Sequence, residues 1–371
     1  MLFLKNLLRL LAAALLAAPV AAQNPPIVIH HIGPFTGVLA ASNKESIDGA
    51  NLYLDAFNAR GGVQGRPVKL ETLDDGQDPK RAKALLEELL KKRPLALLLP
   101  RTTPSMEAML PGVTQSGTPV VGPQTGGSFV NSPPRREVFT LRASYQKEAE
   151  TAIRMQHGIG VGSFAVLLAD DVFGSDTMIA IDKTFKELKL TPLAVAKVDN
   201  RKPDVTEPVN TILAKAPQVV LLVVSSKAAS DFVKRYRAQG GNATFISLSN
   251  TSNNDYIQGL GDQARGAIVM QVMPSPFSGS TLLARDYANA AAKQKLSLSY
   301  AGFYGYASAK LLALGLTRAG PQVTPASLIA ALEGMGEIDL GGFRVRYGPN
   351  DRVGSNFVDS AIITVGGKFL R

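Results

Sequence analysis

Short apolar runs alternate with amphipathic stretches along most of the chain. The apolar runs are continuous, which is typical of parallel strands covered on both faces. Between them, apolar residues such as Ile47, Ala50, Leu54 and Phe57 recur at spacings of three and four, which predicts helices. This alternation predicts an α/β fold built from doubly wound parallel sheets. We expect strands at 27–32, 68–73, 95–99, 119–121, 163–169, 193–198, 218–224, 243–248 and 267–272.

Two breaks divide this pattern. The first is 122–136, which is rich in Gly, Pro and Ser and precedes a short apolar run at 138–141. The second is Met273-Pro274-Ser275-Pro276, where the prolines stop a strand. Beyond it the pattern predicts helices at about 281–294, 300–319 and 324–334, followed by strands at 343–347 and 357–365.

The first residues predict an export signal. Lys5 and Arg9 give a positive start, 10–18 is apolar, and Val20-Ala21-Ala22 fits a small-residue cleavage site. The apolar segment is shorter than the ~20 residues that a membrane span needs. We therefore expect 1–22 to be a signal peptide and the mature protein to be soluble in the periplasm, with no other membrane segment and no stable membrane insertion.

Composition narrows the class of protein. The 371 residues contain no cysteine, which excludes a lipid-anchoring cysteine, disulfides and thiolate metal sites. The formal charge is +10, and +8 without Lys5 and Arg9. The basic residues are spread over predicted helices without interleaved aromatic residues, so we expect no nucleic-acid binding.

The chain offers no specific catalytic or metal-binding pattern. Its histidines are His30, His31 and His157, and neighbours on a strand point to opposite faces, so His30 and His31 do not chelate one ion together. The sequence has no Gly-x-Ser-x-Gly elbow with a plausible histidine partner and no phosphate-binding glycine motif. We interpret Asp74-Asp75 as polar loop residues. The prediction is a protein that is not an enzyme, with no metal or cofactor; an exported hydrolase is the least favoured class.

Loops that follow strands carry candidate binding residues. Gly33-Pro-Phe-Thr-Gly37 follows the first predicted strand and leads into a helix, and ligands of parallel sheets lie beyond the carboxyl ends of the strands. Thr102 and Thr103 lie between the strand at 95–99 and a helix that starts at Pro104. They either hold a carboxylate against the helix dipole, or Thr103 is the N-cap of that helix, and the two roles are compatible.

Further candidates follow strands of the second half. Asp171 either accepts a hydrogen bond from a solute, the role we favour slightly, or caps the next helix, and Phe173 would supply an apolar wall. Ser225 and Ser226 follow another buried strand and could donate hydrogen bonds. Tyr304 either reaches the solute or packs in the core, the more favoured interpretation.

The order of several motifs resembles a known family. These motifs are Gly33-Pro-Phe-Thr-Gly37, Gly61-Gly-Val-Gln-Gly65, Asp74-Asp75 with Asp78-Pro79, Ser116-Gly-Thr-Pro119, Leu141-Arg-Ala-Ser-Tyr145, Asp170-Asp-Val-Phe-Gly174, Gln271-Val-Met-Pro-Ser-Pro276 and Leu340-Gly-Gly342. Together they resemble the type I periplasmic solute-binding proteins of ABC transporters, in the branched-chain amino-acid-binding group. The resemblance covers essentially the whole mature chain.

The resemblance implies two α/β lobes joined by three crossover strands. Lobe one would comprise 24–143 plus 275–350, and lobe two 144–274 plus 351–371. The crossings would lie near Leu141, Pro274 and Tyr347. Closure of the lobes over a solute is the working motion of this family.

The resemblance also implies binding residues in lobe one. Gln124, Thr125 and Gly126 match positions that bind a solute carboxylate, and Ser42 matches a wall position. Arg101 departs from the family, which more often has a small or neutral residue there. Arg101 either pairs with an anionic solute or is solvated at the rim, and we favour the rim.

A second departure concerns lobe two. Amino-acid binders of the family carry an acidic residue that anchors the ligand's ammonium at the position that is Ser249 here, followed by Asn250. An ammonium buried without a counter-charge would cost several kcal/mol. Either Asp171 replaces the missing acid, or the solute lacks an amino group.

The function implied is that of a periplasmic substrate-binding component. It would capture a small carboxylate-bearing solute, either an amino acid or an aromatic or aliphatic carboxylic acid, and deliver it to the permease subunits of an ABC transporter. We expect a monomer. The alternative is a ligand-sensing receptor of the same fold without a transport role.

Overall fold

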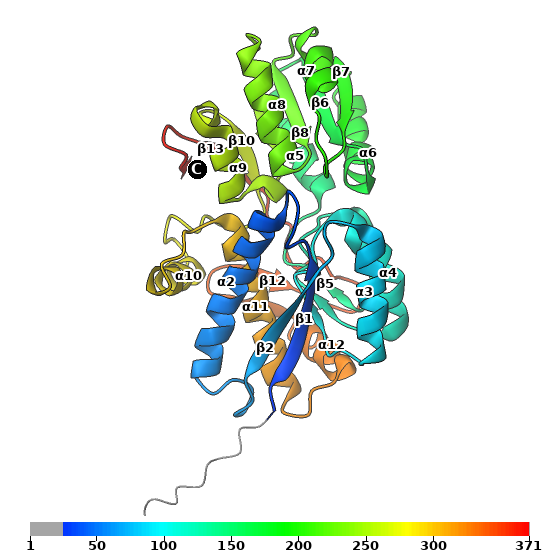
Figure 1. Cartoon of the computed structure of the whole chain (residues 1–371), viewed down its shortest axis with the longest axis vertical. Coiled ribbons are helices and arrows are strands. Elements are labelled where there is room, and N and C mark those ends of the chain that lie inside the picture. Colours follow the sequence, from blue (N-terminus) through cyan, green and yellow to red (C-terminus); the bar gives the residue numbers. More distant parts are fainter. Residues whose placement is uncertain (1–24, 371) are drawn as a thin grey trace, which may run out of the picture.

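Two β-sheets with helices on both faces organise residues 25–370, the part of the chain that the computed structural model describes (Figure 1). The first sheet is parallel, with the strand order β2-β1-β3-β4-β5. Its strands and helices are β1 (Ile27–Gly33), α2 (Ala40–Ala59), β2 (Val68–Asp74), α3 (Pro79–Lys91), β3 (Leu97–Leu98), α4 (Thr103–Ser116), β4 (Val120–Val121) and β5 (Val138–Phe139).

The second sheet has the order β14-β13-β10-β9-β8-β6-β7. The chain enters it through α5 (Tyr145–Gly158), β6 (Phe164–Ala169), α6 (Val172–Glu187), β7 (Ala194–Val198), α7 (Thr206–Leu213), β8 (Val219–Val223), α8 (Ser226–Ala238), β9 (Thr244–Ser247), α9 (Asn254–Leu260) and β10 (Ile268–Gln271). It then returns to the first sheet through α10 (Leu282–Lys293), α11 (Tyr300–Ala319), α12 (Pro325–Glu333), β11 (Glu337–Asp339) and β12 (Arg344–Arg346), and ends in the second with β13 (Asp359–Ile363) and β14 (Phe369–Leu370).

Continuous apolar strands arise because both faces of each sheet are buried. In β6, Ala165 and Leu167 belong to the core under α7 and α8, whereas Val166 and Leu168 belong to the core under α5 and α6. Because successive side chains of a strand point to opposite faces, this one strand contributes to the cores on both faces of the sheet. This confirms the predicted α/β class, built from sheets with helices on both faces.

The structure differs from the predicted strands at the edges. The runs at 95–99, 119–121 and 138–141 contain only the two-residue strands β3, β4 and β5. The strands β13 and β14 are antiparallel additions to a parallel sheet, and β11 and β14 were not predicted. The sequence 337–339 alternates polar and apolar residues over only three positions, too few to show a strand period.

We keep the predicted division into lobe one (24–143 and 275–350) and lobe two (144–274 and 351–371) as a working assignment. Near the crossings, the Tyr347 hydroxyl donates to the Thr140 carbonyl at 2.8 Å, and the Gly354 amide donates to the same carbonyl at 2.9 Å. Arg352 is buried there and pairs with Glu333. The first and third crossings are thus held side by side.

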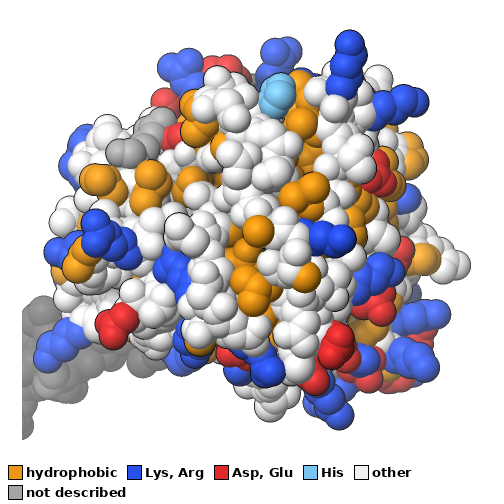
Figure 2. Space-filling view, turned by 90° about the horizontal axis from the view of Figure 1, so that it is seen from above, with side chains coloured by type: hydrophobic (Ala, Val, Ile, Leu, Met, Phe, Trp, Pro, Cys, Tyr) orange, Lys and Arg blue, Asp and Glu red, His pale blue; other side chains and the backbone are white. Residues whose placement is uncertain are grey.

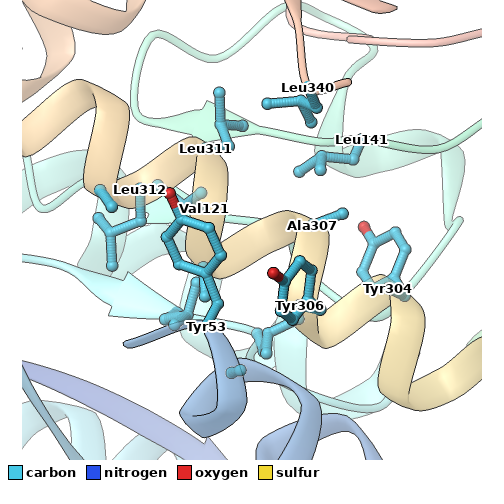
Figure 3. Packing of buried hydrophobic residues seen from close by; sticks show 14 of the residues in the cluster. Tyr53, Val121, Leu141, Tyr304, Tyr306, Ala307, Leu311, Leu312 and Leu340 are labelled. Carbon is cyan, nitrogen blue, oxygen red and sulfur yellow. The ribbon is translucent and has the colours of Figure 1, made fainter. Parts of the chain in front are cut away.

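Two helices of lobe one meet at their backbones. A Cβ atom on Gly49 of α2 would lie 1.9 Å from the carbonyl oxygen of Gly302 in α11, so only glycine allows this approach. Farther along, the rings of Tyr53 and Tyr306 pack edge to face with centroids 5.2 Å apart (Figure 3). The pair α2–α11 forms the main contact between the helices on this side of the sheet.

Charged side chains are dispersed over the end of the molecule that carries the second sheet. Figure 2 shows Lys and Arg spread around the edge of this face, with Asp and Glu between them. Within residues 25–370, no helix combines the length and the apolar character that crossing a membrane requires. The predicted signal peptide, 1–22, lies outside the described residues.

Candidate functional site

A cavity of about 590 Å³ lies between the two lobes. Its wall comes from loops that follow strands of both sheets, including Gln77 and Arg101 of lobe one and Asn200 of lobe two, and from Gln271 at the end of β10. The cavity therefore lies beyond the carboxyl ends of the parallel strands, where the α/β architecture leaves helix N-termini directed at open space.

Two polar contacts join the lobes beside this cavity. On one side, the Ser128 amide of lobe one donates to the Asp176 carboxylate of lobe two at 2.9 Å. On the other side, the Asn254 amide donates to the Glu45 carboxylate at 3.1 Å. The lobes are thus in contact on both sides of the cavity.

The N-terminus of α4 faces the cavity through Thr102 and Thr103. The N-cap is Thr102, whose hydroxyl accepts from the Ser105 amide at 3.2 Å, so the interpretation of Thr103 as the cap is wrong. Thr102 has φ 70°, a left-handed conformation that is strained for a β-branched residue. Thr103 shares a hydrogen bond of 2.8 Å with Thr125, which lies behind the wall.

Arg101 is buried in the wall of the cavity. The residue is only 8% exposed, so the interpretation of Arg101 as a solvated residue at the rim is wrong. The guanidinium donates to Gln124 at 2.6 Å and to Ser42 at 2.8 Å. Gln124 in turn donates to Asn43 at 3.3 Å, and Asn43 lies 3.1 Å from a ring nitrogen of His31. A chain of neutral groups therefore fixes the Arg101 guanidinium.

His31 ends this chain as a buried, neutral imidazole. Burial, and to a smaller extent the Arg101 charge, lower the pKa of His31 to about 4. The second ring nitrogen lies 3.1 Å from the Leu98 carbonyl, to which it can donate. The desolvated Arg101 guanidinium also has a lowered pKa, chiefly because of burial.

Ser249 donates hydrogen bonds to a buried ion pair, Arg142–Glu148. Its amide donates to the Glu148 carboxylate at 2.7 Å and its hydroxyl at 2.9 Å, while Arg142 pairs with the same carboxylate and lies over the Tyr145 ring, 4.2 Å from its centroid. The Glu148 side chain is fully buried. Sequence reasoning missed Arg142 and Glu148; the signal was a helix start, Ser144, followed by an acid in the first turn.

Asp171 caps α6. Its carboxylate accepts from the Phe173 amide at 2.8 Å and the Gly174 amide at 3.4 Å, and burial raises its pKa. The Phe173 ring packs against Tyr145 with centroids 4.6 Å apart. All three of Asp171, Phe173 and Tyr145 line the cavity, so they supply a polar cap beside an aromatic wall.

Asn250 contributes an acceptor without a partner. Its amide nitrogen donates to the Val224 carbonyl at 2.8 Å, whereas its Oδ1 atom is buried and accepts no hydrogen bond from the described residues. Because Asn250 lines the cavity, a hydroxyl or N–H group of a solute could supply the missing donor.

The other predicted residues divide between the wall and the layer behind it. Ser225 caps α8 and lines the cavity, and Tyr304 lines it while its hydroxyl donates to the Pro123 carbonyl at 3.1 Å. Ser226 is turned toward Asn253. The predicted residues found in the wall are Thr102, Thr103, Gln124, Asp171, Phe173, Ser225, Ser249, Asn250 and Tyr304, whereas Ser42, Thr125, Gly126 and Ser226 lie outside it.

Two parallel-sheet lobes around a shared cavity define the class of two-lobed solute-binding proteins. The sequence pattern of the family described as periplasmic binding protein matches residues 26–361, so the chain belongs to this family.

Similar proteins carry different descriptions. The Leu/Ile/Val-binding protein BraC3 of Rhizobium johnstonii is 22% identical over 346 residues, which cover 93% of each chain. The structure of a substrate-binding periplasmic protein from Ralstonia solanacearum is 29% identical, with a TM-score of 0.88, covering 93% of this chain and 99% of that one. A fatty acid ABC transporter substrate-binding protein from Thermomonospora curvata shares the fold at 17% identity and a TM-score of 0.85, covering 94% of this chain and 92% of that one.

Proposed function

We propose that this protein is the periplasmic substrate-binding component of an ABC transporter. It captures a small carboxylate-bearing solute, either an amino acid or an aromatic or aliphatic carboxylic acid, by closure of its lobes and delivers it unchanged to the permease subunits. The observation that carries the proposal is the cavity of about 590 Å³ enclosed between two lobes, within the size range of small-molecule sites.

The residues proposed to hold the solute come from both lobes. Thr102 and Thr103 would receive its carboxylate at the N-terminus of α4, where the helix dipole favours an anion, and Gln124 would support the site by holding Arg101. Residues of lobe two, among them Phe173 and Asn250, would complete the site on closure. A solute that contacts both lobes binds the closed arrangement more tightly, and this difference in affinity drives the closure.

Calorimetry and X-ray scattering on the purified mature protein test this function. Titration with a library of amino acids, aromatic acids and aliphatic acids should find one solute that binds one to one. The same solute should reduce the radius of gyration and be recovered unaltered. Absence of binding and of compaction across the library would refute the proposal, and conversion of the solute would show an enzyme instead.

A further inference from the structure

Arg101 is a buried cation without an ion-pair partner among the described residues, since Glu45 and Asp255 attract it only from beyond ion-pair distance. Both partners of its guanidinium, Gln124 and Ser42, are neutral, and among residues 25–370 no carboxylate forms an ion pair with it. Burying a charge without a partner is costly, and natural proteins pair such charges. The other buried guanidinium of the wall, Arg142, shows the usual solution, since Glu148 neutralises it.

The carboxylates of the wall are already engaged elsewhere. Asp78 caps α3 and Asp171 caps α6. Asp170 and Asp199 are exposed and pair with Lys197 and Arg201, respectively. The wall therefore offers an anion the unpaired charge of Arg101, whereas the acceptor that it offers an ammonium is the Asp171 carboxylate, which already accepts hydrogen bonds from two backbone amides.

The neutral chain behind Arg101 fixes this charge in place. Gln124 and Ser42 use some of the guanidinium's N–H groups, and the remaining N–H groups donate to no acceptor among the described residues. A carboxylate is the acceptor that best fits such a fork, because it can take two parallel N–H bonds.

We propose that the solute is an organic acid without an ammonium group, whose carboxylate is bound by Arg101. This inference rests on the proposed function and narrows its class of solute. The vacant acceptor of Asn250 requires only a neutral donor, such as a hydroxyl group. Tyr145 and Phe173 supply an aromatic wall for the body of the acid.

Three probes of one shape separate the possibilities. 3-Phenyllactate carries a carboxylate and a hydroxyl, 3-phenyllactamide has lost the charge, and phenylalanine has an ammonium in place of the hydroxyl. Each is titrated calorimetrically into the wild-type protein and into Arg101→Gln. We expect the wild type to bind the acid at least about tenfold more tightly than either analogue, which corresponds to about 1.4 kcal/mol.

The substitution should act on the charge alone. Arg101→Gln should weaken binding of the acid at least about tenfold and change binding of the amide much less. The difference between these two effects measures the interaction between the Arg101 charge and the carboxylate of the solute. Arg101→Lys keeps the charge but loses the fork, and should preserve the preference for acid over amide at reduced affinity. Lys83→Gln, which removes an exposed charge of α3, is the matched control and should leave the preference unchanged.

The outcomes distinguish this inference from the function on which it rests. Equal loss of acid and amide binding in Arg101→Gln, or phenylalanine binding as tightly as the acid, overturns the inference and leaves a solute-binding protein. If none of the three probes binds, the solute found by screening the library decides between the outcomes. A neutral or zwitterionic solute overturns the inference. An organic acid replaces phenyllactate, with its own amide as the uncharged analogue, in the comparison of wild type with Arg101→Gln. No binding by any solute overturns the proposed function itself.

Discussion

Substitution of Glu148 by glutamine should destabilise the protein strongly. The Glu148 side chain is fully buried and that of Arg142 is 6% exposed, so the variant leaves a buried guanidinium without its counter-ion. The Ser249 amide and hydroxyl now donate to different oxygens of the carboxylate, at 2.7 and 2.9 Å, so the glutamine would present its N–H₂ group to one of the two. Breaking a buried pair from one side costs about 3–5 kcal/mol.

Thermal and urea unfolding measure this loss. At roughly 2–4 °C per kcal/mol for units of this size, Glu148→Gln should lower the melting temperature by about 6–20 °C. Glu150→Gln removes a partly exposed carboxylate on the same helix, where it pairs with Arg154 and Lys147, and should cost less than about 1 kcal/mol.

Replacing both partners tests the cause. Arg142→Met combined with Glu148→Leu leaves no unpaired charge, so this double variant should recover most of the stability lost in Glu148→Gln. Burial raises the pKa of the Glu148 carboxyl, and the Arg142 charge opposes the rise. If Glu148→Gln melts no lower than Glu150→Gln, the carboxyl is protonated in the folded protein and the argument for an ion pair is refuted.

Three further outcomes are expected. The pKa of His31 is about 4 in the folded protein and 6.5 ordinarily, so the neutral imidazole stabilises the fold above pH 6.5, and up to about 3 kcal/mol of the free energy of unfolding is lost as the pH falls toward 4. In urea unfolding at several pH values, His31→Gln should reduce this pH dependence. A variant with the same pH dependence as the wild type would contradict the prediction. Asp176→Ala removes a contact between the lobes and should raise the radius of gyration of the solute-free protein in X-ray scattering. Asp182→Ala, on the exposed face of α6, should leave the radius unchanged. Equal radii for the two variants would refute the role of Asp176 in holding the lobes together. Gly49→Ala would push α2 away from α11 and should lower the free energy of unfolding in urea by about 1–3 kcal/mol. Gly158→Ala, where an added Cβ has no atom within 4 Å, should leave it unchanged. Similar unfolding midpoints for the two variants would contradict the tight packing at Gly49.

The predicted strands and helices follow from local patterns. The run 164–169 is apolar at every position because both faces of β6 are buried. Asp78-Pro79 marks the start of α3 because the Asp78 carboxylate accepts from the Lys80 amide. The loops that line the cavity could also be located, since each follows a predicted strand. The boundaries between lobes and the binding roles of the thirteen candidate residues remain predictions.

The electrostatics of the site could not be predicted in this way. Glu148 lies 101 positions before Ser249 in the chain, and no local signal shows that its carboxylate occupies the place where an acid at 249 would act. Arg101 looked like a rim residue because arginine is mostly exposed in proteins. Its burial depends on Ser42 and Gln124, which the fold brings together from α2 and from the loop after β4.

The backbone contact between α2 and α11 bears on how such a protein can change its solute during evolution. Leu39 precedes α2 and Tyr304 lies on α11, and both line the cavity, so a shift of one helix moves the other and alters several positions of the wall at once. In lobe two, by contrast, Asp171 and Ser225 each belong to a separately capped loop. Changes of specificity should therefore be rarer at the wall residues of α2 and α11 than in separately capped loops such as those that carry Asp171 and Ser225.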